Sequence, residues 1–139
     1  MNRAWYLDSS VLLSRLFRQA GALDPADLAP AFTSALTKVE CFRSLDRNRL
    51  LGRVSDRESV EGRDYLYRMF RTVRLVGLES AVLDRAAAPI SVPLKTLDAI
   101  HLTTALQWRE DMEEDVTFAT HDARLAAAAR AHGFPVLGA

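Results

Sequence analysis

Cysteine is almost absent from this chain, because Cys41 is the only one among its 139 residues. One cysteine cannot form an internal disulfide, and it cannot build a cysteine-ligated metal centre. Long apolar runs are also missing at the N-terminus, where MNRAWYLDSS reaches Asp8 too early for a signal peptide or a membrane span. We therefore expect a cytoplasmic protein without a membrane segment.

Histidine is scarce as well. The three histidines, His101, His121 and His132, lack the close spacing of metal-ligand pairs. This spacing favours hydrogen-bonded or solvent-facing histidines over a zinc site.

The chain does have enough apolar residues for a core. Hydrophobic residues occupy 49% of the 139 positions, which suits one compact domain that folds without disulfides. No internal repeat or linker interrupts the sequence. We predict a single domain over residues 1–139.

Charges balance overall at 18 basic and 18 acidic residues, but they are unevenly distributed. Residues 43–74 contain nine arginines against five acidic residues, a net charge of +4. Residues 75–139 contain five basic and nine acidic residues, a net charge of −4. An arginine-rich helical region can contact phosphates, although a solvated helix face explains any one of these arginines equally well.

Short apolar runs of strand length alternate with longer segments of helical period. The predicted strands are residues 4–7, 31–33, 73–78, 116–119 and 135–137. Two predicted helices begin after the caps Asp8 and Ser34, and Gly21 and Pro25 are expected to end the first of them. Four more helices are predicted over residues 55–70, 79–88, 96–110 and 122–131. This alternation predicts a three-layer α/β/α fold with a central parallel sheet of four to five strands flanked by helices.

Four acidic residues from separate parts of the chain interrupt locally apolar patterns: Asp8, Glu40, Asp98 and Asp122. Asp8 follows the first strand and Asp122 the fourth, and each also stands where a helix begins, so either can be a plain helix cap. Glu40 lies at the border of an apolar stripe, where an ion pair with Arg43 is the slightly favoured explanation.

Asp98 stands out on a helical wheel. A turn of about 100° per residue places it between Leu102 and Ala105 on the apolar face, with Thr103 and Thr104 on the other side. A first-turn acid favoured by the helix dipole is the alternative, but such an acid does not need the apolar face.

Together the four acids predict a metal site, which none of them predicts alone. Ligands of parallel sheets bind beyond the carboxyl ends of the strands, where Asp8 and Asp122 are expected, and Asp98 and Glu40 can join them. Packed carboxylates repel one another unless a cation neutralises them. Oxygen ligands without cysteine or histidine suit Mg²⁺ or Mn²⁺.

Four segments of the chain resemble the PIN-domain family, and within it the VapC-type toxins of bacterial toxin–antitoxin pairs. They are YLDSS at 6–10, TSALTKVE at 33–40, TLDAIHL at 96–102, and THDARL at 120–125 followed by GFPV at 133–136. LDAIHL is the most specific of them, and residues 53–88 contain no distinctive match.

The resemblance implies a PIN-like fold and an endoribonuclease that hydrolyses single-stranded or loop RNA with Mg²⁺ or Mn²⁺. It implies that Asp8, Glu40, Asp98 and Asp122 form the catalytic metal site, with Thr120 as a supporting hydroxyl residue. It also implies a homodimer and a cognate antitoxin protein that blocks the site.

Two other functions stay open. Receiver-like or haloacid-dehalogenase-like phosphoryl-transfer domains also place acids after the first strand, but the dehalogenase motif has a second aspartate where this chain has Ser10, and Lys38 and Lys95 are poorly placed for the receiver lysine. A PIN-like interaction module without catalysis would use its acids to bind basic peptides. Such a module would show neither metal-dependent RNA cleavage nor marked stabilisation by metal.

Overall fold

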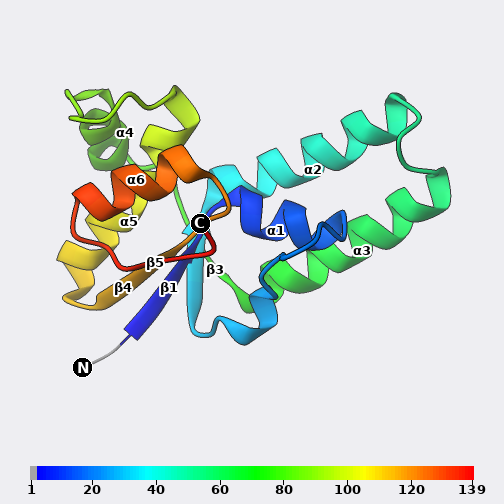
Figure 1. Cartoon of the computed structure of the whole chain (residues 1–139), viewed down its shortest axis with the longest axis horizontal. Coiled ribbons are helices and arrows are strands. Elements are labelled where there is room, and N and C mark those ends of the chain that lie inside the picture. Colours follow the sequence, from blue (N-terminus) through cyan, green and yellow to red (C-terminus); the bar gives the residue numbers. More distant parts are fainter. Residues whose placement is uncertain (1–2) are drawn as a thin grey trace.

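A parallel sheet forms the centre of the computed structural model, which describes residues 3–139. Its five strands lie in the order β3–β2–β1–β4–β5, and each neighbouring pair is parallel (Figure 1). The strands are β1 Arg3–Leu7, β2 Ala31–Ser34, β3 Arg74–Val76, β4 Asp115–Ala119 and β5 Val136–Leu137. The predicted parallel sheet of four to five strands is confirmed, and all five predicted strands form.

Helices cover both faces of this sheet. Those in the described part of the chain are α1 Ser9–Leu16, the short 3-10 helix η1 Pro25–Asp27, α2 Ala35–Leu50, α3 Asp56–Thr72, α4 Ser80–Ala87, α5 Thr96–Met112 and α6 Ala123–Ala131. Figure 1 shows α4, α5 and α6 on one side and α1, α2 and α3 on the other. This confirms the predicted three-layer arrangement. The predicted domain, 1–139, also includes Met1 and Asn2, which lie outside the described residues.

No helix within residues 3–139 combines the length and the apolar composition needed to cross a membrane.

Alternate side chains of β1 enter the cores on both faces of the sheet. Tyr6 packs with Phe32 and Phe118 on the face covered by α5 and α6, whereas Leu7 packs with Val11 of α1 on the opposite face. All five side chains are at most 1% exposed. Burial on both faces fixes the carboxyl end of β1, which is the end that leads into Asp8.

The strand order changes direction at β1. From β1 the chain adds β2 and β3 on one side and then returns to add β4 and β5 on the other. Open parallel sheets bind ligands at such a switch point, beyond the carboxyl ends of the strands. Leu7 is paired with Ala119 there, so Asp8 and Thr120 follow from neighbouring strands. Receiver-type sheets have the order 2-1-3-4-5 instead, so the topology does not support the receiver alternative.

The first helix is shorter than the sequence predicted. It ends at Leu16 rather than near Gly21, because Arg18 adopts a left-handed φ of 54° and turns the chain earlier. The glycine also has a positive φ, of 75°, but it lies in the loop that follows.

The helical wheel of α5 was wrong about its polar side. Thr103 and Thr104, expected on the side away from the apolar face, are 2% and 1% exposed, whereas Leu97 in the first turn is 44% exposed. The sheet covers α5 on one side and α4 on another, so the middle of the helix is buried all round. Its threonines are accommodated because Thr103 Oγ1 donates to the carbonyl of Ala99 at 2.8 Å, and Thr104 makes the equivalent bond.

Candidate metal and active site

Asp8 is a deeply buried carboxylate at the switch point of the sheet. It is 3% exposed, and its side chain does not cap α1, so the helix-cap explanation is wrong. Burial raises the pKa of Asp8 to about 6, although the electrostatic effect of nearby His101 and the hydroxyls of Ser10 and Thr120 lower it. Within the described chain its side-chain contacts are hydroxyl groups rather than a lysine or arginine. A buried carboxylate in this setting is stabilised by a bound cation.

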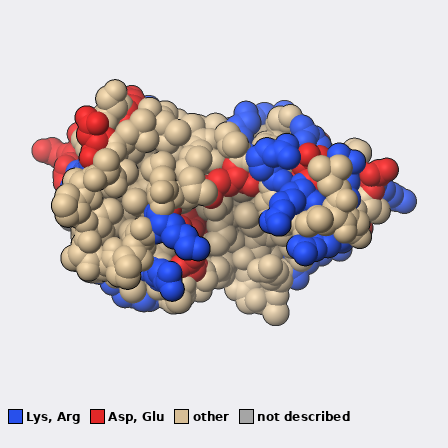
Figure 2. All heavy atoms as spheres, turned by 90° about the horizontal axis from the view of Figure 1, so that it is seen from above, with Lys and Arg blue, Asp and Glu red and all other residues tan. Residues whose placement is uncertain are grey.

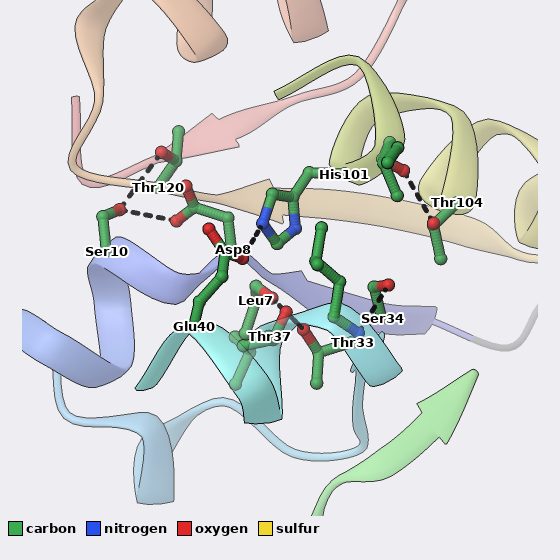
Figure 3. Close-up of polar contacts among 12 residues, drawn as sticks. Leu7, Asp8, Ser10, Thr33, Ser34, Thr37, Glu40, His101, Thr104 and Thr120 are labelled. Atoms are coloured by element: carbon green, nitrogen blue, oxygen red, sulfur yellow. Dashed lines mark hydrogen bonds and ion pairs between the residues drawn. The ribbon is translucent and has the colours of Figure 1, made fainter. Parts of the chain in front are cut away.

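Two hydroxyl residues connect Asp8 to the loop after β4. Ser10 Oγ donates to Asp8 Oδ1 at 2.5 Å, accepts from the His121 amide at 2.8 Å, and lies 3.3 Å from Thr120 Oγ1. Thr120 Oγ1 in turn accepts from the Asp122 amide at 3.0 Å. Figure 3 shows Ser10, Thr120 and Asp8 side by side, with Glu40 and His101 next to them. Thr120 therefore lies between the two acids at the strand ends.

Asp122 does cap a helix. Its Oδ1 accepts from the amides of Arg124 and Leu125, both at 2.9 Å, at the start of α6. The negative charge of Asp122 also raises the pKa of Asp8 and of Asp98. The residue therefore has a structural role and contributes to the electrostatics of the pocket.

Asp98 lies half-buried in the first turn of α5. Burial is the main cause that raises its pKa, and the charges of Asp122 and Glu40 raise it further, while His101 and Lys95 lower it. Asp122 therefore acts electrostatically on both Asp8 and Asp98, and Glu40 acts on Asp98, although the four acids come from separate parts of the chain.

Glu40 has a different partner from the one favoured by the sequence. Its Oε1 lies 2.6 Å from His101 Nε2, whereas Arg43 pairs with Asp46 at 3.3 Å. The predicted Glu40–Arg43 ion pair is therefore wrong. The spacing of the histidines did not indicate His101 as a site residue, although its position three residues after Asp98 places both on one helix face.

The donor set of this pocket fits a hard divalent cation, because it consists of carboxylate and hydroxyl oxygens. As the side chains stand, however, no three histidine, cysteine, aspartate or glutamate side chains within residues 3–139 gather closely enough to hold a metal ion. Glu40 is bonded to His101, and one oxygen of Asp122 is used by the α6 cap. Metal binding by Asp8, Glu40, Asp98 and Asp122 stays a prediction.

The basic surface lies to one side of these acids. Figure 2 shows lysine and arginine atoms gathered over the end of the molecule formed by α2 and α3, with acidic atoms near the middle. Side-chain exposure is 67% for Arg43 and 61% for Arg68. This is the arginine-rich region, residues 43–74, that the sequence singled out.

Gly138 packs against the backbone of Thr120 and offers a test of how tightly the pocket is supported. Its φ is 102°, and a Cβ added there would lie 2.5 Å from the Thr120 carbonyl oxygen. We expect Gly138→Ala to displace the Thr120 loop and to destabilise the protein by about 1–3 kcal/mol. Urea unfolding measures this loss, and Gly77→Ala is the matched control because no atom lies within 4 Å of its added Cβ. Equal stability of the two variants would contradict the expectation.

A family model described as a PIN domain matches residues 5–131, a range that contains all four acids and Thr120. A search of curated protein sequences finds no significant match.

Several solved structures share the fold. A toxin–antitoxin complex from Klebsiella pneumoniae aligns with a TM-score of 0.64 at 19% identity over 95% of this chain and 94% of that one. PAE2754 from Pyrobaculum aerophilum aligns with a TM-score of 0.64 at 18% identity over 98% and 92%. VapC20 from Mycobacterium tuberculosis, described as a sarcin-ricin loop cleaving toxin, aligns with a TM-score of 0.58 at 15% identity over 97% and 98%. At these identities the likeness shows the fold alone.

Proposed function

The chain belongs to the PIN-domain family, and from that premise we propose that it is a metal-dependent endoribonuclease that acts as the toxin of a toxin–antitoxin pair. The observation that carries the proposal is the buried carboxylate of Asp8, whose pKa is raised to about 6 beside further acids at the switch point of the sheet. Such a group is costly to bury unless a cation neutralises it.

Each acid has a distinct part in this proposal. Asp8 and Asp98 are the principal ligands of a Mg²⁺ or Mn²⁺ ion, and Glu40 and the free oxygen of Asp122 complete the acidic pocket. Ser10 and Thr120 orient the carboxylate of Asp8 through their hydroxyls. When bound, the cation would supply Lewis-acid chemistry, namely activation of a water for attack on phosphorus and neutralisation of the charge that develops on the phosphate.

The substrate is RNA, held by its phosphates. We propose that arginines of α2 and of the turn after it, such as Arg43, Arg47 and Arg53, contact the backbone on one side of the acids. This accounts for a net charge of +4 over residues 43–74 in a chain with no net charge overall.

The proposed partners are a cognate antitoxin and a second copy of the chain, in the cytoplasm. Support for an antitoxin comes from the Klebsiella pneumoniae structure, which is a toxin–antitoxin complex with the same fold. Support for RNA as the substrate comes from VapC20, whose description names cleavage of the sarcin-ricin loop.

Incubation of the purified protein with end-labelled RNA tests the activity. We expect cleavage with Mg²⁺ or Mn²⁺, none with EDTA, and recovery when excess Mn²⁺ is added back, because the phosphate cannot approach bare carboxylates. Gel electrophoresis resolves the products. Cleavage that persists in EDTA would point to a contaminating metal-independent ribonuclease and contradict the proposal.

A catalytically silent PIN-like interaction module is the second candidate. It is favoured by the absence, within residues 3–139, of three potential ligands close enough to hold an ion. For this candidate, neither Mg²⁺ nor Mn²⁺ should produce cleavage, and neither should raise the melting temperature. A marked rise with Mn²⁺ excludes it.

A further inference from the structure

A chain of hydrogen bonds runs from the core to the acidic pocket through two buried side chains. Tyr6 Oη lies 2.5 Å from His101 Nδ1, and His101 Nε2 lies 2.6 Å from Glu40 Oε1. Tyr6 is fully buried and His101 is 1% exposed, whereas the Glu40 side chain is 19% exposed. The three residues come from β1, α5 and α2, so the chain joins three elements at the switch point.

The chemistry of these groups fixes which atom donates. An ionised carboxylate only accepts, so the hydrogen in the bond between His101 and Glu40 belongs to His101 Nε2. Burial raises the pKa of Tyr6 well above its usual value, so its hydroxyl keeps its hydrogen at neutral pH and can donate to the lone pair on Nδ1. A hydrogen on Nε2 and a lone pair on Nδ1 therefore satisfy both bonds, an assignment made from the bonding partners of the ring.

Aromatic packing holds this chain in place. The ring of Tyr6 stacks on Phe118 with centroids 4.9 Å apart and meets Phe32 edge-on at 5.3 Å. The imidazole of His101 lies edge-on to Tyr6 at 5.9 Å. Neither Tyr6 nor His101 can reorient without disturbing the main core, so the position of Nε2 is fixed by the fold.

Glu40 would otherwise have several positions open to it. It lies within α2 at the edge of the buried helix face, where it is partly exposed. A flexible glutamate in such a place samples several rotamers. The bond from His101 is made to Oε1, which leaves Oε2 for another partner. Figure 3 shows Glu40 next to Asp8, on the side of the pocket where His101 enters.

We propose that His101, itself held by Tyr6, is a positioning residue that fixes the carboxylate of Glu40 as a ligand for the divalent cation in this pocket. The inference rests on the proposed function, because it assigns a role in holding the proposed ion. Ligating carboxylates are commonly fixed by such outer hydrogen bonds, and loss of the outer partner weakens metal binding by about 10–100-fold.

Titration of the full chain with Mn²⁺ in the absence of RNA tests the inference, with calorimetry as the readout. We expect His101→Leu to raise the Kd for Mn²⁺ by about 10–100-fold. His101→Gln should restore most of the affinity, because its amide N–H can donate to the same carboxylate. Tyr6→Phe keeps the ring but removes the hydroxyl, and we expect a smaller loss. His132→Gln is the matched control, since His132 bonds to the Ala128 carbonyl on α6.

Thermal unfolding in EDTA shows whether each variant is folded. If His101→Leu does not fold, the Mn²⁺ affinity of Tyr6→Phe tests the inference instead. Wild-type affinity for Mn²⁺ in both His101→Leu and Tyr6→Phe would overturn the inference and leave the proposed function intact. Unchanged affinity in Glu40→Gln would also overturn it, because Glu40 would then not be a ligand. A wild-type protein that binds no Mn²⁺ would overturn both proposals together.

Discussion

Replacement of Asp8 by Asn should abolish metal-dependent RNA cleavage and at the same time make the metal-free protein more stable at neutral pH. Asn has nearly the same shape as Asp, but it carries no charge for the proposed cation. Loss of several kcal/mol of transition-state stabilisation corresponds to a fall in rate of about 100-fold or more.

The gain in stability follows from the pKa of Asp8. Folding raises this pKa from 3.8 to about 6, so the folded state binds the proton more tightly than the unfolded state does. This contribution to stability is fully present below pH 3.8 and is lost as the pH rises through about 6. At pH 7 a shift of this size corresponds to about 3 kcal/mol of destabilisation, and Asn removes the charge that causes it. Because Asn loses the strong bond from Ser10, we expect a net gain of about 1–3 kcal/mol.

Urea unfolding in EDTA between pH 4 and pH 7.5 measures this effect. The stability difference between Asp8→Asn and the wild type should grow across the range from about pH 4 to pH 6 and then level off. Asp84→Asn, at an exposed acid of α4, is the charge-matched control and should show no such growth. An Asp8→Asn protein that is less stable than the wild type at pH 7 would show that the buried charge has a partner and needs no cation.

Periodicity and caps were enough to predict the layers of the fold. The alternation of short apolar runs with helical segments predicted all five strands, and Ser34 caps α2 as expected, accepting from the Leu36 amide. The wheel of α5 failed because it assumed one buried side. The structure buries this helix on several sides, and threonine can hide its hydroxyl by bonding to its own helix.

Positions of the acids along the chain were easier to predict than their contacts. Asp8 and Asp122 follow β1 and β4, as local patterns indicated, because strand ends are readable from sequence. The bond between Glu40 and His101 spans 61 residues. No local pattern shows which residue a glutamate at the edge of a buried helix face will bond to. A nearby arginine was therefore favoured, although the fold provides a histidine from another element.

Asp98→Asn should abolish cleavage and leave the fold intact, and this is the second large effect that we expect. The charges of Asp122 and Glu40 and partial burial all disfavour the ionised form of Asp98, so the fold gains little from its charge. Its favourable interaction with the amino end of α5 amounts to only about 0.3–1 kcal/mol. The melting temperature in EDTA should therefore change little, while Mn²⁺ affinity and RNA cleavage are lost together.

Asp122→Asn is the variant with which Asp98→Asn should be compared. Asn caps helices about as well as Asp, so the start of α6 should persist and only the charge at the pocket is removed. If Asp98 is a principal ligand and Asp122 mainly shapes the pocket, the first variant should lose far more Mn²⁺ affinity than the second, measured by the same calorimetric titration. Full activity in Asp98→Asn would refute its assignment as a ligand. Equal losses in the two variants would mean that the pocket responds to its total charge rather than to ligands in defined positions.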